Sequence, residues 1–177
     1  GLDMRAMGND PWGLGYDPVS KNLYWGDCNS IAIVSSNLDG TGQQTVTSVT
    51  DPRSVAYDPV GNKLYIRSCP STCQIQAYDF GSSTLEPAIV VGMDGSGTLA
   101  LDTERGRVYW SDTVGTSSIK YVSVSTPAVQ TSVITGITGN ILGIYVDGPN
   151  DYLYWSEVTS QKIQRADLNG VNQNIVT

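Results

Sequence analysis

The chain repeats one five-residue phrase four times at nearly constant intervals. The phrase reads LYWGD at 23–27, LYIRS at 64–68, VYWSD at 108–112 and LYWSE at 153–157. Its tyrosines follow one another after 41, 44 and 45 residues, and the ten residues before each phrase align as well. A period of about 40 to 45 residues is typical of repeat architectures. The repeat unit is therefore the element whose fold must be explained.

Each unit contains four short segments with strand character, separated by turn dipeptides such as Asp-Pro, Asn-Gly and Asp-Gly. Four strands in chain order predict an antiparallel meander, which has two large faces and cannot bury both by itself. Sheets of this kind pack face to face as propeller blades. We therefore predict an all-β fold of the β-propeller type, with four four-stranded blades. The recurrent isoleucine of the third strand is expected at Ile31, Ile75, Ile119 and Ile163.

The repeats assign residues 1–177 to a single propeller-type domain. We expect blades at about 11–49, 50–91, 92–135 and 136–177, preceded by a leading segment at 1–10. The chain begins and ends at the same phase of the repeat. Three arrangements are open: a closed ring of four blades, part of a larger ring, or a module that continues into another copy.

The repeated aromatic and acidic residues are predicted to be structural. Tyr-Trp pairs supply large apolar area for the space between neighbouring sheets. A carboxylate present in every repeat is expected to accept turn or interstrand hydrogen bonds, because a catalytic carboxylate is needed only once. The predicted structural residues are Tyr24, Trp25, Asp27, Tyr65, Tyr109, Trp110, Asp112, Tyr154, Trp155, Asp17, Asp58, Asp102 and Asp147.

Composition argues against several classes of function. The sequence has no histidine, which removes Ser-His-Asp and Cys-His catalysis and histidine metal ligands. A net charge of −7, with only ten Lys and Arg, argues against nucleic acid and favours a basic protein partner. DGTG at 39–42 and DGSG at 94–97 fit turns better than calcium or phosphate loops. We expect no enzyme activity, no cofactor and no metal.

Three cysteines give an odd count. A local disulfide between Cys69 and Cys73 is predicted in CPSTC, with Cys28 free; pairing of Cys28 with Cys73 and three buried thiols in a reducing compartment are the alternatives. A disulfide favours an extracellular or secreted location. The sequence has no run of about 18 apolar residues, so it predicts no membrane span. Because the chain starts at Gly1 and not at Met, we expect it to be processed or part of a longer chain.

The repeat resembles the YWTD repeats of the low-density-lipoprotein receptor family, also called class B repeats. The resemblance covers residues 11–177 and rests on the first-strand aspartate, the Tyr-Trp-x-Asp core, the third-strand isoleucine and the Asp-Gly or Asn-Gly turn after it. YWGD and YWSD match well, YWSE is a conservative variant, and YIRS lacks both Trp and Asp. The family closes six blades into a ring, whereas four repeats occur here. The resemblance implies receptor or matrix propellers that bind other proteins.

In propellers, the segments that enter each first strand and the loops between second and third strands share one rim, where partners usually bind. Trp12 and Arg53 occupy matching places in DPWGL and DPRSV, and Trp and Arg are enriched at interface hot spots. The predicted rim residues are Trp12, Arg53, Arg67, Asp112 and Glu157. The alternative for Trp12 is a cap over a gap between blades, and for Arg67, Asp112 and Glu157 a solvated or turn-bonding residue.

Three functions are compatible with these features. The leading hypothesis is a non-enzymatic extracellular module that binds a protein partner through the rim. The second is a structural subunit whose apolar blade ends dock head to tail onto other copies and build an oligomer or filament. The third is a fragment of a metal-dependent hydrolase of the six-bladed lactonase type, for which the sequence offers no cluster of ligands that occurs only once.

Overall fold

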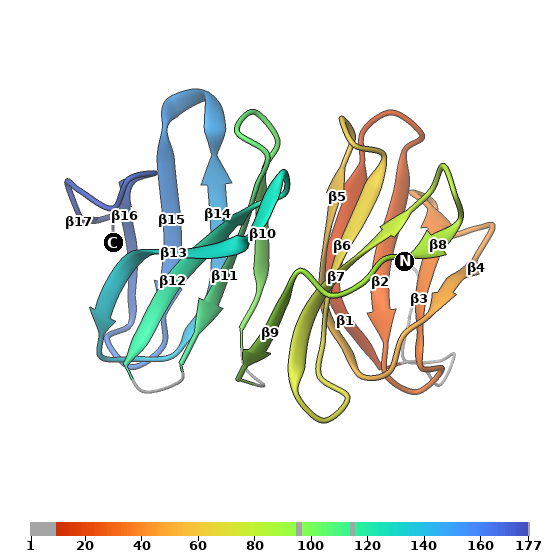
Figure 1. Cartoon of the computed structure of the whole chain (residues 1–177), viewed down its shortest axis with the longest axis horizontal. Coiled ribbons are helices and arrows are strands. Elements are labelled where there is room, and N and C mark those ends of the chain that lie inside the picture. The colour runs from red at the N-terminus through yellow and green to blue at the C-terminus, as the bar shows by residue number, and fades with distance from the viewer. Residues whose placement is uncertain (1–9, 95–96, 114–115, 177) are drawn as a thin grey trace. The chain divides into compact units, whose positions relative to one another are not determined.

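The computed structural model describes residues 10–94, 97–113 and 116–176, and almost all of its regular structure is β (Figure 1). The strands form four antiparallel sheets, one for each repeat, and in each sheet they run in chain order. The described residues contain one short 3-10 helix, η2 (Gly148–Asn150). The predicted all-β fold with four-stranded propeller-type blades is confirmed. The chain divides into two compact units, Gly1–Val91 and Gly92–Thr177.

The first unit holds the blades of the first two repeats. Blade 1 consists of β1 (Pro11–Asp17), β2 (Asn22–Asp27), β3 (Ala32–Asn37) and β4 (Gln44–Ser48). Blade 2 consists of β5 (Pro52–Asp58), β6 (Lys63–Ser68), β7 (Cys73–Asp79) and β8 (Thr84–Leu85), and β9 (Val90–Met93) also pairs with β7.

The second unit holds the other two blades. Blade 3 consists of β10 (Leu99–Asp102), β11 (Arg107–Asp112), β12 (Ser117–Ser123) and β13 (Thr126–Ile137). Blade 4 consists of β14 (Ile141–Asp147), β15 (Tyr152–Glu157), β16 (Lys162–Asp167) and β17 (Asn174–Ile175).

The turn between the first and second strands is built in the same way in all four blades. The last turn residue has a positive φ of 59° at Lys21, 50° at Asn62, 59° at Gly106 and 62° at Asp151. This left-handed conformation lets the second strand turn back beside the first. The side chain of the first-strand aspartate accepts hydrogen bonds inside the turn, for example from the backbone N–H of Val19, 2.8 Å from Asp17.

Each unit has a core between its two blades. In the first unit, Tyr24 and Ile33 of blade 1 pack with Val55, Leu64 and other residues of blade 2. In the second unit, the aromatic pair of the repeat contributes from both sides, with Tyr109 of blade 3 and Trp155 of blade 4 in one cluster. The face-to-face packing that the repeat requires is thus present within each unit.

Three details of the sequence interpretation were wrong. The recurrent isoleucine of blade 1 is Ile33, because Ile33 pairs with Gly26 as Ile163 pairs with Ser156, whereas Ile31 lies in the preceding turn with a φ of 54°. The outer strand of blade 2 is divided between β8 and β9. The expected boundary between residues 135 and 136 falls inside β13. The expected leading segment lies outside the described residues except for Asp10.

Candidate protein-binding site

Trp12 and Arg53, from the first strands of two adjacent blades, come together at the surface of the first unit. The Cζ atom of Arg53 lies 5.0 Å from the centre of the Trp12 indole ring, within the range of a cation–π contact. Trp12 is 45% exposed, and the Arg53 side chain is partly exposed. The sequence placed both residues at matching repeat positions but did not show that they touch.

Asp51 holds the Arg53 guanidinium in place. Arg53 Nε lies 2.8 Å from Asp51 Oδ1, and Arg53 Nη2 donates to Asp51 Oδ2 at 3.0 Å. This two-point contact fixes the plane of the guanidinium. The hydrogen bond to Asp51 raises the pKa of Arg53 above its usual value, despite partial burial. Trp12 therefore lies against a cation whose position Asp51 sets.

The backbone brings β1 close enough to β5 for this contact. β1 has a register shift between Trp12 and Gly15, and β5 has one between Pro52 and Ser54. Gly13 has a φ of 64°, and a Cβ atom on it would lie 2.7 Å from the Cα atom of Ser54. Only glycine fits this close approach without moving a backbone. Bulges of this kind redirect side chains at the end of a strand.

Cys28 contacts the segment that carries Asp51 and Pro52, next to Arg53. Its Sγ atom lies 3.3 Å from the carbonyl oxygen of Pro52 and 3.5 Å from Asp51 Oδ1, both acceptors for a thiol. Burial raises the pKa of the Cys28 thiol to about 11, and the neighbouring Asp51 carboxylate adds to the effect. Because the thiolate is the reactive form, this raised pKa disfavours reaction at Cys28. Cys69 and Cys73 form a disulfide, and Cys28 is free.

Three of the five predicted rim residues are buried, so their side chains cannot make the expected surface contacts. Arg67 is 0% exposed, and Asp112 and Glu157 are 5% and 6% exposed. Asp112 Oδ2 accepts a hydrogen bond from Lys120 Nζ at 2.7 Å. Arg67 points to one face of its sheet and Asp112 and Glu157 to the other, and they are buried because both faces of β6 and β11 are covered from the second residue of the strand onward.

Glu157 is bound entirely within blade 4. Its Oε1 accepts the indole N–H of Trp155 at 2.9 Å and a second bond from Gln164, and its Oε2 accepts from Ser160 Oγ at 2.7 Å. No hydrogen-bond partner for the indole N–H of Trp25 or Trp110 lies among the described residues. The extra methylene of Glu157, compared with Asp27 and Asp112 at the same repeat position, lets it reach the indole.

The repeated aspartates bind backbone and side-chain groups of their own turns. Asp27 accepts from the backbone N–H groups of Asp10 and Asn29, and from Ser30 Oγ at 2.7 Å. Burial works to raise the pKa of Asp27, but these hydrogen bonds outweigh it and hold the pKa below its usual value. Asp58 and Asp102 accept backbone N–H groups in the same way, whereas Asp147 is bound by the Asn150 amide.

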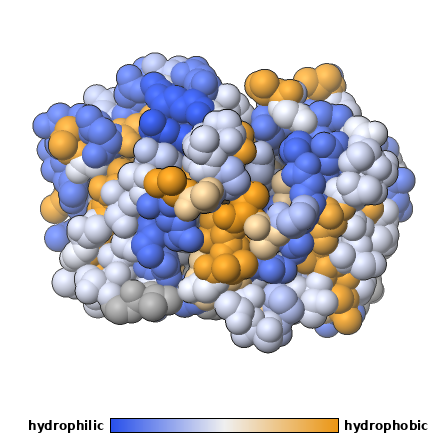
Figure 2. Space-filling view, viewed as in Figure 1, coloured by the Kyte–Doolittle hydropathy of each residue, from blue (hydrophilic) through white to orange (hydrophobic). Residues whose placement is uncertain are grey.

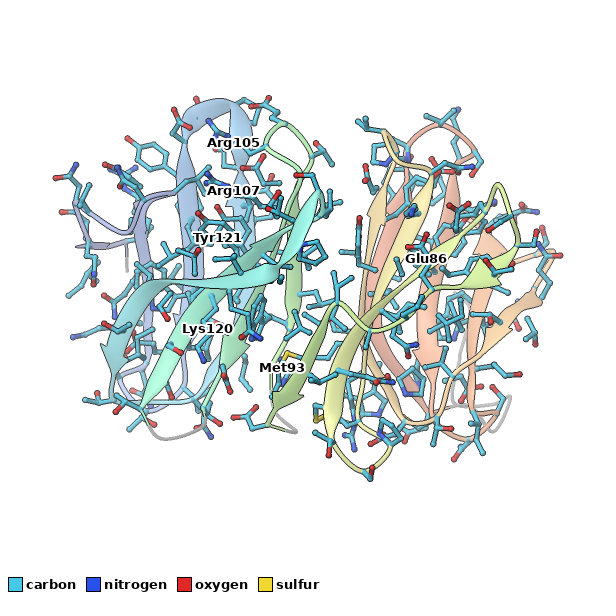
Figure 3. All side chains as sticks on the ribbon, in the orientation of Figure 1. Glu86, Met93, Arg105, Arg107, Lys120 and Tyr121 are labelled. Atoms are coloured by element: carbon cyan, nitrogen blue, oxygen red, sulfur yellow. A yellow bond between two sulfur atoms is a disulfide. The ribbon has the colours of Figure 1, made fainter. Side chains whose placement is uncertain are left out.

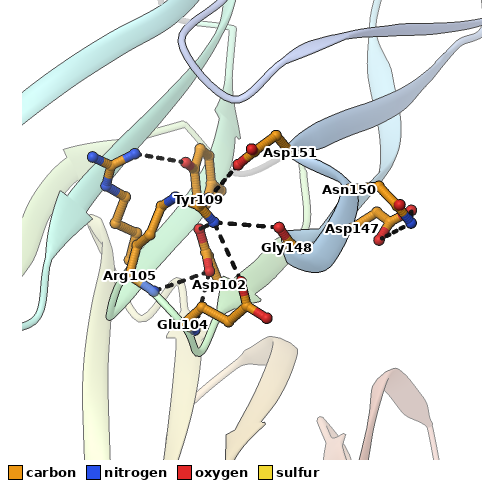
Figure 4. A network of polar contacts seen from close by, with 9 residues as sticks. Asp102, Glu104, Arg105, Tyr109, Asp147, Gly148, Asn150 and Asp151 are labelled. Carbon is orange, nitrogen blue, oxygen red and sulfur yellow. Dashed lines mark hydrogen bonds and ion pairs between the residues drawn. The ribbon is translucent and has the colours of Figure 1, made fainter.

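A second polar cluster, which the sequence reasoning missed, lies between blades 3 and 4. Arg105 Nη1 lies 3.2 Å from Asp102 Oδ2, and Nη2 pairs with Asp151 across the two turns (Figure 4). A cavity of about 300 Å³ beside it is lined by Arg105, Arg107 and Asp151. Arg107 lies over the ring of Tyr121 at 4.4 Å, and all three of Arg105, Arg107 and Tyr121 lie in blade 3 (Figure 3). The signal in the sequence was that Arg105 is the one long side chain at its turn position.

Neither a metal centre nor a membrane span is apparent in the part of the chain that the structure describes. No group of three or more His, Cys, Asp or Glu side chains there is arranged to hold a metal ion. No described helix is long and apolar enough to cross a membrane.

The fold defines an all-β chain of propeller-type blades, and the Trp12 and Arg53 pair lies at the surface of its first unit. Residues 151–177 match the family model of the low-density lipoprotein receptor repeat class B. The chain is 30% identical to the mouse low-density lipoprotein receptor-related protein 5 over 105 residues, which cover 58% of this chain and 6% of that protein. The resemblance to YWTD repeats is thereby confirmed.

Solved structures share the fold at low sequence identity. A crystal structure of a nidogen/laminin complex superposes with a TM-score of 0.80 and 16% identity, covering 93% of this chain and 62% of that chain. A gluconolactonase of Xanthomonas campestris, described as important in glucose secondary metabolic pathways, superposes with a TM-score of 0.75 and 13% identity, covering 94% and 62%. At these identities the superpositions show a common fold and no common activity.

Proposed function

We propose that the chain is a non-enzymatic extracellular interaction module that binds a protein partner through Trp12 and Arg53. The observation that carries the proposal is a half-exposed indole beside a guanidinium that Asp51 already holds. Interface hot spots are enriched in Trp and Arg, and a preset side chain loses little entropy on binding. The class B repeat match, the similarity to a receptor-related protein and the nidogen/laminin complex support a protein partner.

A basic segment is the partner that the local charges favour. Asp10 and Asp51 each lie two residues before a site residue, in the equivalent sequences DPW and DPR. The Asp51 carboxylate is shared with Arg53, whereas Asp10 is exposed and the whole chain carries a net charge of −7. An aromatic face next to exposed carboxylates favours Lys or Arg side chains. The partner therefore carries basic residues beside an apolar one.

A displayed library of random peptides tests the site without knowledge of the natural partner. Peptides selected on the wild-type chain should be rich in Lys and Arg, and Trp12→Ala should weaken their binding by about 30-fold, the effect of an interface hot spot of about 2 kcal/mol. Val60→Ala, at an exposed turn of the same unit, is the control and should leave binding unchanged. Equal binding to Trp12→Ala, with an unchanged melting temperature, would remove the site from the proposal.

The absence of enzyme activity is part of the same proposal. Three features favour it: a sequence without histidine, repeated carboxylates engaged in turns, and a protonated Cys28 thiol. The gluconolactonase with the same fold supplies a direct assay. Purified chain should not accelerate hydrolysis of gluconolactone with or without added divalent cations, and acceleration abolished by a chelator would favour the hydrolase alternative instead. The Cys69–Cys73 disulfide supports an oxidising, extracellular location.

A further inference from the structure

A polar cavity lies between blades 3 and 4, where the turns that precede β11 and β15 come together. Its volume is about 300 Å³, at the lower end of the range for small-ligand sites. The surface of the second unit is strongly hydrophilic at its upper end, over these turns (Figure 2). Both walls of the cavity belong to the second unit. The residues that line it are Arg105, Arg107, Asp151, Asp167, Leu168 and Asn169.

An ion pair in blade 2 shows how the same two strand ends are neutralised elsewhere in the chain. Lys63 is the first residue of β6, and it pairs in the sheet with Asp79, the last residue of β7. Lys63 Nζ lies 3.5 Å from Asp79 Oδ2 and forms a second ion pair with Glu86. The cationic position and the acidic position of this repeat therefore neutralise each other within blade 2.

Blades 3 and 4 each keep one half of this ion pair. In blade 3, Arg107 occupies the cationic position, but the residue opposite it in the sheet is Ser123. In blade 4, Asp167 occupies the acidic position, but the residue opposite it is Tyr152. Neither Arg107 nor Asp167 forms an ion pair with any other residue that the structure describes. One cavity is thus lined by a cation of blade 3 and an anion of blade 4 that do not pair with each other.

The Arg107 guanidinium is oriented by two tyrosines. Its Cζ atom lies 4.4 Å from the centre of the Tyr121 ring, and its Nη1 donates to Tyr109 Oη at 3.5 Å. A guanidinium carries five N–H donors in a rigid fork, and only one of them has an acceptor among the described residues. The fork matches the two oxygens of a carboxylate, so Arg107 can receive a carboxylate through two parallel hydrogen bonds.

The Asp167 carboxylate retains acceptor capacity. Its Oδ2 accepts a hydrogen bond from Asn172 Nδ2 at 2.7 Å, and an ionised carboxylate offers about four acceptor sites. The other charged residues of the lining, Arg105 and Asp151, are paired with each other. The charges left for a ligand are therefore those of Arg107 and Asp167.

We infer that this cavity binds a free α-amino acid, with the carboxylate of the ligand on Arg107 and its ammonium group on Asp167. A ligand with one charge would leave either Arg107 or Asp167 without a counter-charge, whereas a small zwitterion serves both. A phosphate or sulfate ester would place added negative charge beside Asp151 and Asp167, which is unfavourable. The site lies in the other unit from Trp12 and Arg53, and the inference does not depend on that pair.

Isothermal titration calorimetry of the full chain with L-glutamine, L-serine and L-leucine tests the inference. At least one of the three should bind at one site per chain with a dissociation constant of about 1 mM or lower. Analogues of the tightest ligand that lack the ammonium or the carboxylate should each bind at least about tenfold more weakly. For L-glutamine these analogues are 4-carbamoylbutanoate and 4-aminobutanamide.

Substitutions assign the two charges of the ligand to the two walls. Arg107→Gln and Asp167→Asn should each weaken binding at least about tenfold, and Arg107→Lys should weaken it less than Arg107→Gln, because Lys keeps the charge but not the fork. Lys63→Gln is the matched control, since Lys63 holds the same repeat position as Arg107 in blade 2, and it should leave binding unchanged. Melting curves confirm that each variant is folded, and Arg107→Lys with the two analogues decides the point if Arg107→Gln is unfolded.

Three results would overturn the inference: no saturable binding of any of the three amino acids to the folded wild-type chain, binding of both single-charge analogues as tightly as the amino acid, or unchanged binding in the folded variants of Arg107 and Asp167. Trp12→Ala should bind the amino acid as the wild type does. A failure of the peptide-binding site and a failure of the amino-acid site are therefore distinguishable.

Discussion

The two blade pairs pack the same repeat in different ways. Between blades 1 and 2 the backbones themselves come close: a Cβ atom on Gly13 would lie 2.7 Å from Ser54 Cα, and one on Gly26 would lie 2.9 Å from the carbonyl oxygen of Pro52. Between blades 3 and 4 large side chains fill the core, with Tyr109 and Trp155 in one cluster and Arg105 paired with Asp151 at the turns, and the backbones come close only elsewhere, where a Cβ atom on Gly170 would overlap the carbonyl oxygen of Val133 in β13. One repeat pattern therefore tolerates two packing solutions.

The difference predicts where each pair is sensitive to substitution. A contact between backbones is sensitive to added atoms, because neither strand can move aside cheaply. A contact between large side chains is sensitive to removed atoms, because a cavity remains. Substitutions that reverse this expectation would show that the two pairs share one mode of packing after all.

The largest effect is expected from loss of a repeat tryptophan in the second unit. Trp155→Ala removes a fully buried ring from a large cluster and should lower the free energy of unfolding by about 4 to 5 kcal/mol. Trp25→Ala should cost about 3 kcal/mol, because Trp25 packs in a small cluster with only Ala32, Val34 and the partly buried Leu23. Urea unfolding of both variants measures the difference. An equal or larger loss for Trp25→Ala would contradict the comparison.

An intermediate effect is expected from a methyl group added to the contact of the first unit. Gly13→Ala must keep a φ of 64° and places its Cβ against Ser54, which should cost about 2 to 3 kcal/mol. The matched control is Gly143→Ala at the same repeat position of blade 4. Its Cβ would meet only the side-chain Oγ of Ser156 at 3.2 Å and no backbone atom, so we expect less than about 1 kcal/mol. Similar losses in the two variants would show that the close approach of β1 to β5 does not matter for stability.

The smallest effect is expected from shortening Glu157. Glu157→Asp should lose the 2.9 Å bond to the Trp155 indole and lower the free energy of unfolding by about 1 kcal/mol, since one buried donor loses its partner. Glu157→Gln keeps an acceptor oxygen at the same reach and should cost less. Thermal unfolding of the two variants side by side decides the point. A greater loss for Glu157→Gln would assign the stabilisation to charge and not to side-chain length.

The sequence predicted what the repeat itself determines. Strand order and turn positions follow from a pattern that recurs four times. The burial of Arg67, Asp112 and Glu157 does not follow from strand alternation, because Arg67 faces the opposite side of its sheet from the other two and both faces of β6 and β11 are covered. The recurrent isoleucine was assigned to Ile31 because both Ile31 and Ile33 fit an alignment of the repeats. Only the pairing of Ile33 with Gly26 in the sheet identifies Ile33 as the equivalent residue.

Features that depend on neighbouring sheets could not be predicted from the repeat. Trp12 and Arg53 were identified as equivalent residues, but their contact requires the close approach of β1 to β5 that Gly13 permits. Tyr154 and Ile163 look like Tyr24 and Ile33 in the sequence, and their exposure depends on what packs against blade 4. Local sequence describes a side chain, whereas burial is a property of the pair of surfaces that meet.

The turns between the first and second strands share one backbone conformation, so the turn of one blade can replace that of another. Each places a residue of left-handed conformation at its last position, yet the loop sequences themselves differ. Transplanting the loop of blade 3, which has Gly106 at that position, into blade 1 in place of Lys21 would retain the geometry and relieve its steric cost. The turn sequences of the four repeats can therefore be exchanged among the blades to engineer a more stable variant.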